Sequence, residues 1–390
     1  MFRIRTMNKI SAPGLELFPG DRYEVAADLP NPDAILVRSA DLRGARLPDS
    51  VLAIARAGAG VNNIPVGECS GRGIVVFNTP GANANAVKEL AIASMLLCSR
   101  NIVGGINWAA SIAGEAGGVP ELVEREKARF GGPELRGKTL GVVGLGAIGA
   151  MVANDAAVLG MDVVGFDPFI SVDSAWSLSR AVARADSLDG LLAGADYLTL
   201  HAPLCDDTKG LLNAEKFRLM RKGARIVNLS RGGLVNEADM IEALNGGKLA
   251  AYVTDFPSAR LLACKGAICI PHLGASTPEA EDNCASMAAR QLVDFLESGE
   301  ILNSVNYPPC RLERRAPHRL LVTNRNVPNM VGQITTLLAE ANVNIADLIN
   351  RHLGGLAYNI IDTEQEIPED VLGRLGQIDG VARFRIVGKD

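Results

Sequence analysis

The sequence predicts an α/β protein built around a Rossmann-type, doubly wound dinucleotide-binding domain. Two observations predict this class. Residues 137–149, GKTLGVVGLGAIG, join a short apolar strand to a glycine pattern and then to a helix. From Leu140 onward the chain has six strand-like runs with helical stretches between them, namely LGVVG, MDVVGF, DYLTLH, ARIVNL, LAAYVT and AICIPH. Strands that alternate with helices are typical of a parallel sheet covered on both faces.

The glycine pattern explains why this stretch should bind a dinucleotide. Gly144, Gly146 and Gly149 form G-x-G-x-x-G between the predicted strand and a predicted helix over 147–159. The first glycine permits a tight turn, the second lets the backbone approach a pyrophosphate, and the third lets the helix pack close to the strand. The alternative interpretation is a glycine-rich turn in some other α/β protein.

An acidic residue at the end of the next strand indicates which dinucleotide is bound. Asp167 follows the predicted strand 161–166. A carboxylate there accepts hydrogen bonds from the ribose hydroxyls and disfavours a 2′-phosphate. The sequence therefore predicts NAD as the cofactor rather than NADP.

Composition limits the other possibilities. The 390 residues suggest two or three domains, and a net charge of −5 without a long Lys or Arg run gives no reason to expect a nucleic-acid partner. The seven cysteines are scattered and include no C-x-x-C pair, so we expect no disulfide framework, no metal site and a cytoplasmic location. Neither a signal peptide nor a membrane-spanning run is expected, and hence no membrane partner.

The N-terminal part predicts a second, smaller parallel sheet with the flavodoxin-like architecture. Runs at 34–37, 51–55 and 73–77 are short and apolar, and each ends in a loop of small or polar residues. Because ligands bind beyond the carboxyl ends of such strands, these loops are candidates for a substrate site.

Helices connect this region to the dinucleotide fold. Residues 84–101 predict a long helix closed by Arg100-Asn101 and Gly104-Gly105, residues 104–136 are polar and helix-prone, and 279–297 predict an amphipathic helix that returns to the first domain. The expected domains are therefore 1–93 with 276–306 for substrate, 94–275 for NAD, a linker at 307–317, and 318–390.

The last segment has its own pattern. Its predicted order is strand 318–323, helix 328–341, strand 343–352, strand 356–363, helix 368–376 and strand 381–387. This β-α-β-β-α-β order is ferredoxin-like.

Four polar residues follow strands of the dinucleotide fold and are therefore expected at its ligand-binding edge: His201, Arg231, Asp255 and His272. An arginine among small residues can bind a carboxylate through two hydrogen bonds. Histidine is the natural general base near neutral pH. These groups suit hydride transfer from a 2-hydroxy acid. Between the two histidines we favour His272 as the base and expect His201 to line the cofactor site, although either could be a core residue.

Four motifs resemble the D-isomer-specific 2-hydroxyacid dehydrogenases: GKTLGVVGLGAIG, HAPLCDDTKGLLN, NLSRGGLVNEADMIEAL and PHLGAST. The N-terminal segment AGAGVNNIPVGECSGRGIVVFNTPGANANAVKEL resembles members that act on a phosphorylated substrate, and the last segment resembles an ACT domain, a common amino-acid sensor. The resemblance implies oxidation of 3-phospho-D-glycerate to 3-phosphohydroxypyruvate with NAD, the first step of L-serine biosynthesis.

The resemblance also implies roles for individual residues. Arg231 would bind the substrate carboxylate, and His272 would be the general base. The residues expected near the substrate are Arg38 and Ser39 at its phosphate, Ala59 and Gly60 at its carboxylate, and Asn83 and Lys127. The residues expected to bind the cofactor are Gly144, Gly146, Ala147, Ile148, Gly149, Asp167, His201, Ala202, Pro203, Ser230, Asp255 and Gly274.

One position departs from the family pattern. The family places a Glu about five residues after the Asp that ends the fifth strand, where it pairs with the catalytic histidine. Here that position holds Arg260, or Ala259 in the other alignment. We hypothesise that Asp255 takes over this role or combines it with nicotinamide binding.

In the ACT-like segment, Asn326 and Asn344 match serine-binding asparagines, and Asn324 stands where a histidine is common. Their amides could bind an amino-acid effector such as L-serine, or they could simply form turns. Paired ACT domains would make the protein a homo-oligomer, a dimer or a tetramer. Two other functions remain open: a dehydrogenase for another 2-hydroxy acid, such as glycerate or 2-hydroxyglutarate, and a non-catalytic NAD-sensing protein resembling the corepressors that share this fold.

Overall fold

The computed structural model describes residues 1–114 and 118–388. The chain divides into two compact units, a terminal unit formed by Met1–Asn83 with Pro278–Asp390, and a central unit formed by Ala84–Thr277. The division falls at 83/84 and 277/278, whereas the sequence places it at 93/94 and 275/276. The difference arises because the whole helix α3 (Ala84–Ser99) packs in the core of the central unit.

The N-terminal part of the terminal unit contains a parallel sheet. Within the described residues its five strands run in the order β2-β1-β3-β4-β5, which is the order of the flavodoxin-like architecture predicted for this region. The strands are β1 (Phe2–Met7), β2 (Tyr23–Ala26), β3 (Ala34–Val37), β4 (Ala53–Arg56) and β5 (Val75–Phe77), and two short helices are α1 (Ala12–Leu15) and α2 (Val66–Gly71). The sequence did not identify β1 and β2, because they mix charged with apolar residues.

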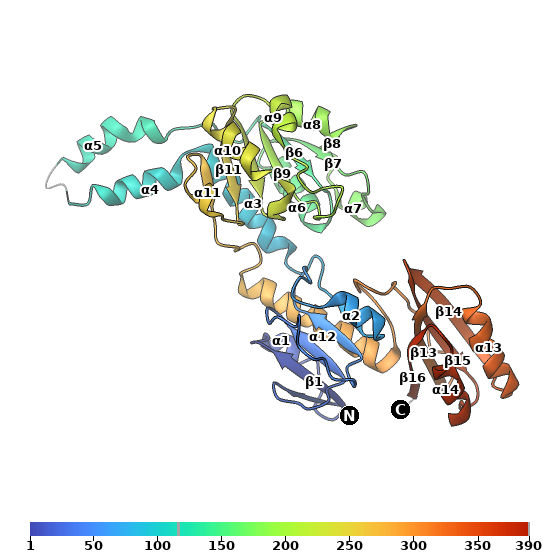
Figure 1. Ribbon diagram of the computed structural model, residues 1–390. Helices are drawn as coiled ribbons and strands as arrows, with labels where there is room; N and C mark the ends of the chain where they lie inside the picture. The colour runs from blue at the N-terminus through green and yellow to red at the C-terminus, as the bar shows by residue number, and fades with distance from the viewer. Residues whose placement is uncertain (115–117, 389–390) are drawn as a thin grey trace. The chain divides into compact units, whose positions relative to one another are not determined.

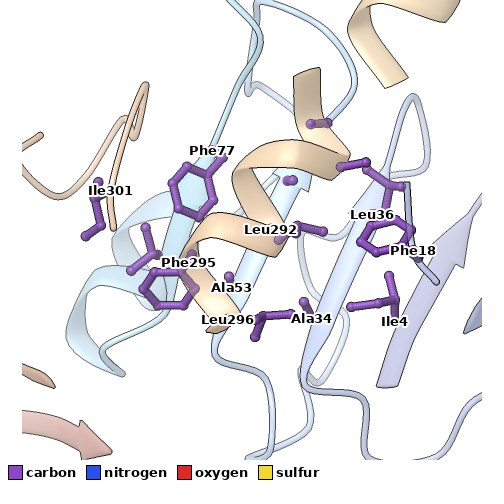
Figure 2. Packing of buried hydrophobic residues seen from close by; sticks show 14 of the residues in the cluster. Ile4, Phe18, Ala34, Leu36, Ala53, Phe77, Leu292, Phe295, Leu296 and Ile301 are labelled. Atoms are coloured by element: carbon purple, nitrogen blue, oxygen red, sulfur yellow. The ribbon is translucent and has the colours of Figure 1, made fainter. Parts of the chain in front are cut away.

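Helix α12 (Pro278–Ser298) covers one face of this sheet, as the sequence predicts for 279–297. Its buried side chains include Leu292, Phe295 and Leu296. These lie against Phe77 and Ala53 of the sheet (Figure 2), and the rings of Phe77 and Phe295 meet edge to face with centroids 5.7 Å apart. The helix therefore belongs to the terminal unit although about 200 residues of sequence separate it from β5.

The C-terminal module, residues 318–388, has the predicted ferredoxin-like order. Its elements are β13 (His318–Arg325), α13 (Met330–Glu340), β14 (Ile345–Leu353), β15 (Leu356–Thr363), α14 (Glu369–Gly376) and β16 (Val381–Gly388). Among the described residues the four strands form an antiparallel sheet in the order β14-β15-β13-β16. Helices α13 and α14 pack on one face of this sheet (Figure 1) and enclose a core that includes Leu320, Ile334 and Leu338.

The other face of the C-terminal sheet shares the core of the N-terminal sheet. Leu321, Tyr358 and Ile360 belong to the same buried cluster as Phe295 and Leu296 of α12. The segment predicted as a linker, 307–317, joins this core, since Tyr307 is fully buried and Cys310 is 2% exposed. That prediction was wrong because the prolines were interpreted as a tether, whereas the segment pairs with Ile301 through the backbone of Cys310.

The central unit contains a parallel sheet that is larger than predicted. Within the part of the chain described, seven strands run in the order β12-β11-β10-β9-β6-β7-β8. They are β6 (Thr139–Val143), β7 (Asp162–Phe166), β8 (Val182–Arg184), β9 (Tyr197–Leu200), β10 (Ala224–Asn228), β11 (Leu249–Thr254) and β12 (Ala267–Cys269). The prediction of six strands missed β8, a three-residue edge strand in which two side chains are exposed. The order from β8 to β11 is the dinucleotide-binding order 3-2-1-4-5-6.

Helices complete the central unit. They are α3, α4 (Ile102–Ser111), α5 (Val119–Glu126), α6 (Ala147–Val158), α7 (Val172–Ser177), α8 (Leu188–Gly194), α9 (Ala214–Leu219), α10 (Glu237–Asn245) and α11 (Ala259–Leu262), with 3₁₀ turns η1 (Lys127–Phe130) and η2 (Gly232–Leu234). Helices α4 and α5 project from the sheet (Figure 1). Gly104 and Gly105 lie inside α4 rather than ending the preceding helix. The Asn101 side chain caps α4 by accepting from the Gly104 amide at 3.1 Å.

In the described part of the chain no single helix has the length and apolarity to cross a membrane. Helices α3 and α4 meet that criterion only as a pair, and the pair bends by 65° at the break.

Candidate active site

The glycine loop between β6 and α6 has a backbone that other residues would not allow. Gly144 has a φ of +88°, and a Cβ there would lie 2.7 Å from the carbonyl carbon of His201. A Cβ on Gly149 would lie 1.9 Å from the carbonyl oxygen of Gly144. Gly144 and Gly149 therefore permit the turn and the close approach of helix to strand.

Gly146 has a different environment. It is exposed, and a Cβ there would meet nothing within 4 Å among the described residues. The fold alone therefore does not require glycine at this position, whereas a pyrophosphate resting on the loop would. This open surface at the N-terminus of α6 fits the cofactor that the sequence predicts.

Asp167 lies at the end of β7, beside the glycine loop. Its Oδ2 accepts the backbone amide of Leu145 at 2.8 Å, and its Oδ1 accepts that of Phe169 at 2.9 Å. The carboxylate thus fixes the loop conformation. Each oxygen keeps a second lone pair for a ribose hydroxyl.

His201 follows β9 and packs against the same loop. Its Nε2 lies 2.9 Å from the hydroxyl of Thr199, and burial lowers the pKa of its imidazole to about 4. The ring is therefore neutral at physiological pH. An imidazole with so low a pKa is a poor proton acceptor near neutrality, which favours His272 as the general base.

The loop after β10 presents Arg231 to solvent. The buried Asn228 supports it by donating to the Arg231 carbonyl at 3.0 Å, and the Ser230 hydroxyl donates to the Ala202 carbonyl at 2.7 Å. The Arg231 side chain donates from Nη1 to the Ser230 carbonyl at 2.7 Å. Its other guanidinium hydrogens can still bind a carboxylate.

Asp255 follows β11 and is 1% exposed. Its Oδ1 has no hydrogen-bond partner among residues 1–114 and 118–388. Burial raises the pKa of the carboxyl, whereas the nearby His272 and the backbone of Gly274 lower it. A buried carboxylate oxygen without a partner is costly, and active sites are where such groups are expected.

His272 lies on the exposed turn after β12. Its ring meets that of Phe256 edge to face, with centroids 5.1 Å apart. The His272 ring therefore lies beside the residue that follows Asp255 in the chain, and its charge lowers the pKa of the Asp255 carboxyl more than that of Arg231 does. Arg260, which stands where the family has Glu, instead pairs with Glu237 at 3.7 Å.

Arg231, Asp255 and His272 all follow parallel strands of one sheet and therefore lie at the same edge as the glycine loop. The residues that the sequence assigns to the substrate phosphate and carboxylate, from Arg38 to Gly60, belong to the terminal unit.

Within the terminal unit, Arg38 follows β3 and Gly60 follows β4. The Arg38 side chain pairs with Glu281 of α12, with Nη2 and Oε1 2.6 Å apart. The Asn8 side chain accepts the backbone amides of Ser39, at 3.1 Å, and Ala40. The Ala59 carbonyl accepts from the Asn78 side chain at 2.6 Å.

The remaining two substrate candidates have distinct surroundings. Asn83 has a buried Oδ1 without a hydrogen-bond partner in the described part of the chain. Lys127 is exposed on η1 and forms an ion pair with Glu124. Among the described residues of the central unit, Lys127 has the surroundings of a solvated surface charge.

The predicted effector residues do not all line one pocket. Asn324 and Asn326 line a cavity of about 200 Å³, together with Asn350. Asn344 is not among its lining residues in the described chain. It directly precedes β14, and its backbone amide donates to the Gln365 side chain at 2.7 Å. Asn350 is a polar residue of this pocket that the sequence did not identify, and the register of β14 on β15 places it there.

Arg56 is a further residue that the sequence missed. It ends β4, donates from Nε to the Arg38 carbonyl at 3.0 Å, and also donates to the Gly60 carbonyl. It thus joins the two candidate substrate loops. Its position at a strand end, like that of Arg38, is the signal that could have identified it.

Comparison with known proteins places this site in a family. Residues 92–274 match the family described as D-isomer specific 2-hydroxyacid dehydrogenase, NAD binding domain. The D-3-phosphoglycerate dehydrogenase of Haemophilus influenzae is 31% identical over 340 residues, which cover 84% of this chain and 79% of that protein. The chain therefore belongs to the D-isomer-specific 2-hydroxyacid dehydrogenase family, and NAD, the cofactor that the glycine loop predicts, is confirmed.

Two further relatives carry the same name. The D-3-phosphoglycerate dehydrogenase of Methanocaldococcus jannaschii is 34% identical over 344 residues and 84% of this chain, and the chain spans 61% of that relative's length. The solved NAD⁺-bound 3-phosphoglycerate dehydrogenase of Entamoeba histolytica has a TM-score of 0.61 at 26% identity, covering 78% of this chain and 98% of that one.

Proposed function

We propose that this chain oxidises 3-phospho-D-glycerate to 3-phosphohydroxypyruvate with NAD, the first step of L-serine biosynthesis. The observation that carries the proposal is the placement of Arg231, Asp255 and His272 at one sheet edge beside the glycine loop. The names of the relatives support the choice of substrate.

The proposed mechanism assigns one task to each residue. Arg231 binds the substrate carboxylate through its planar guanidinium and orients the carbon that carries the hydroxyl. His272 takes the hydroxyl proton as general base. Asp255 holds the imidazole in position and stabilises the imidazolium that forms, which replaces the family's Glu. Bound NAD supplies the hydride acceptor.

Arg38 and Ser39 are proposed to bind the phosphate group of the substrate. The guanidinium of Arg38 has the geometry for a phosphate, and the Ser39 side chain is exposed beside it. Arg56 supports the proposal because it holds the backbone of Arg38 in place.

A panel of acids tests the substrate. NADH formation is followed by absorbance with 3-phospho-D-glycerate, D-glycerate and D-2-hydroxyglutarate. The proposal requires the highest kcat/KM for the phosphorylated acid, and Arg38→Ala should reduce that preference. A preference for an unphosphorylated acid would identify a different dehydrogenase. NAD binding without turnover of any acid would instead favour an NAD-sensing protein.

We further propose that the cavity lined by Asn324, Asn326 and Asn350 binds a small amino acid, with L-serine as the effector to test. Asparagine amides offer both donors and acceptors to a zwitterion. Serine should inhibit turnover and raise the thermal stability, and Asn326→Ala should abolish both effects while Asn344→Ala leaves them. An unchanged rate and stability at saturating serine would refute the proposal.

We also propose an oligomeric state and a cellular location for the protein. We expect a cytoplasmic dimer or tetramer, which light scattering on the purified chain and fractionation of cells would test.

A further inference from the structure

The phosphate-binding candidate Arg38 is already paired with an internal carboxylate. Its Nη2 lies 2.6 Å from Oε1 of Glu281, and both side chains are 39% exposed. Glu281 lies in the first turn of α12, far from Arg38 in sequence. The pair is therefore a tertiary contact, at the loop where the proposed substrate phosphate binds.

Glu281 is an acid in a cationic neighbourhood. Besides Arg38, Arg56 lies close by and donates to the Arg38 carbonyl at 3.0 Å. Both arginines and Glu281 act on the same thiol, that of Cys284, whose pKa is raised by burial and by Glu281 and lowered by the two guanidinium groups. Without Glu281, Arg38 would lose the carboxylate with which it pairs.

Helix α12 fixes the position of Glu281. The neighbouring Asp282 accepts a hydrogen bond from Ser11. Ala285 packs closely against Gly14, since a Cβ on Gly14 would lie 2.6 Å from the Cβ of Ala285. The C-terminal end of the helix is held as well, because Arg385 donates to the carbonyls of Phe295 and Leu296. A helix anchored at both ends cannot withdraw as a body, so the carboxylate stays within reach of Arg38.

We propose that Glu281 is an internal competitor for the anion site at Arg38, which a phosphate group must displace in order to bind. The inference rests on the proposed role of Arg38 in substrate binding. A phosphate offers more oxygens and more charge than a carboxylate and can bind the guanidinium through two hydrogen bonds. Glu281 thereby weakens the binding of phosphorylated acids and of free phosphate, and leaves acids without a phosphate unaffected.

The size of the effect follows from the exposure of the pair. An ion pair as exposed as this one changes an equilibrium by about twofold to fivefold. Repulsion between Glu281 and a dianionic phosphate weakens binding further, so we expect Glu281 to weaken the binding of the phosphate group by about fivefold in all. The effect should appear in KM and leave kcat unchanged, because Glu281 does not touch the reacting carbon.

The test compares Glu281→Gln with Glu279→Gln, a matched control in the same helical turn that changes the net charge equally. Glu281→Gln should lower KM for 3-phospho-D-glycerate and strengthen inhibition by inorganic phosphate, each about fivefold, with KM for D-glycerate unchanged within twofold. Glu279→Gln should change none of these. If Glu281→Gln does not fold, Glu281→Asp, which shortens the side chain, replaces it.

Two results would overturn the inference. A raised or unchanged KM for the phosphorylated acid would show that Glu281 orients Arg38 or is irrelevant to it. Equal effects of both substitutions would show a general charge effect. If the wild-type chain does not oxidise 3-phospho-D-glycerate, the proposed function fails, but the role of Glu281 can still be tested. Calorimetry then measures the binding of inorganic phosphate to the wild type and the variants. Tighter binding to Glu281→Gln, lost in Arg38→Ala, would support the competitor, and equal or absent binding would refute it.

Discussion

A buried ion pair inside the C-terminal module includes an arginine that also binds the rest of the terminal unit. The side chains of Arg319 and Asp362 are 1% and 0% exposed, and they meet through two hydrogen bonds of 2.6 and 2.9 Å. Arg319 also donates to the carbonyls of Ser298, at 3.0 Å, and Leu312, at 2.9 Å. These two carbonyls lie outside the module, so one side chain ties the module to α12 and to the segment that follows it.

Removing both partners of this pair should cost clearly less unfolding free energy than the two single removals added together. Asp362→Asn leaves a buried guanidinium charge without its counter-ion, which costs about 3–5 kcal/mol of unfolding free energy. Arg319→Met leaves the carboxylate with the Arg315 amide as a donor and should cost a similar amount. In the double variant neither charge is stranded, so its cost should fall short of the sum of the two single costs by about 3 kcal/mol.

Urea unfolding followed by far-UV circular dichroism measures the three variants against the wild type. Both tryptophans, Trp108 and Trp176, belong to the central unit, so their fluorescence is an internal control that should not shift. Hydrogen exchange of peptides from 318–388 localises the loss. Single costs below about 1 kcal/mol, or additivity within about 0.5 kcal/mol, would refute the argument that burial makes the two charges interdependent.

Three further predictions concern the central unit. Asp255→Asn should lower kcat by about 10- to 100-fold, because His272 loses its orienting partner, while calorimetry should find an NAD affinity within about threefold of the wild type. A loss of NAD binding alone would contradict the proposed role of Asp255 beside His272. The unfolding free energy should fall by at most about 3 kcal/mol as the pH drops from about 6.5 to about 4, because His201 takes up a proton in the unfolded chain but not in the folded one. A His201→Gln variant should lack this pH dependence. An equal pH dependence in both proteins would assign it to other groups. Gly146→Ala should fold like the wild type but bind NAD more weakly, whereas Gly144→Ala should destabilise the fold itself. Thermal unfolding with and without NAD distinguishes the loss of binding from the loss of stability. Tight NAD binding to Gly146→Ala would show that no pyrophosphate rests at this position.

The parts of the fold that the sequence predicted are those specified by local chemistry. The glycine loop was predictable because Gly144 and Gly149 are required by backbone geometry that neighbouring residues impose. The C-terminal module was predictable because its strands and helices change periodicity clearly along the chain. The edge strand β8 was missed because it has three residues, two of them exposed, which give too short a pattern.

Long-range contacts explain the remaining differences. The segment around Tyr307 contains prolines, which suggest a tether, but its burial depends on the C-terminal sheet, which folds from residues later in the chain. The pairing of Arg38 with Glu281 joins residues more than 200 positions apart, so local pattern cannot reveal it. The same applies to Arg56, whose role lies in two backbone carbonyls rather than in a motif.

We propose above that the sheet edge with Arg231 and His272 oxidises a phosphorylated 2-hydroxy acid with NAD. The most direct measurement follows NADH formation from 3-phospho-D-glycerate by the wild type and by His272→Gln, together with calorimetric NAD binding to both. We expect turnover by the wild type, a loss of about 100-fold or more in the variant, and equal NAD affinity. Equal rates in the two proteins, or no NADH from a wild type that binds NAD, would contradict the claim.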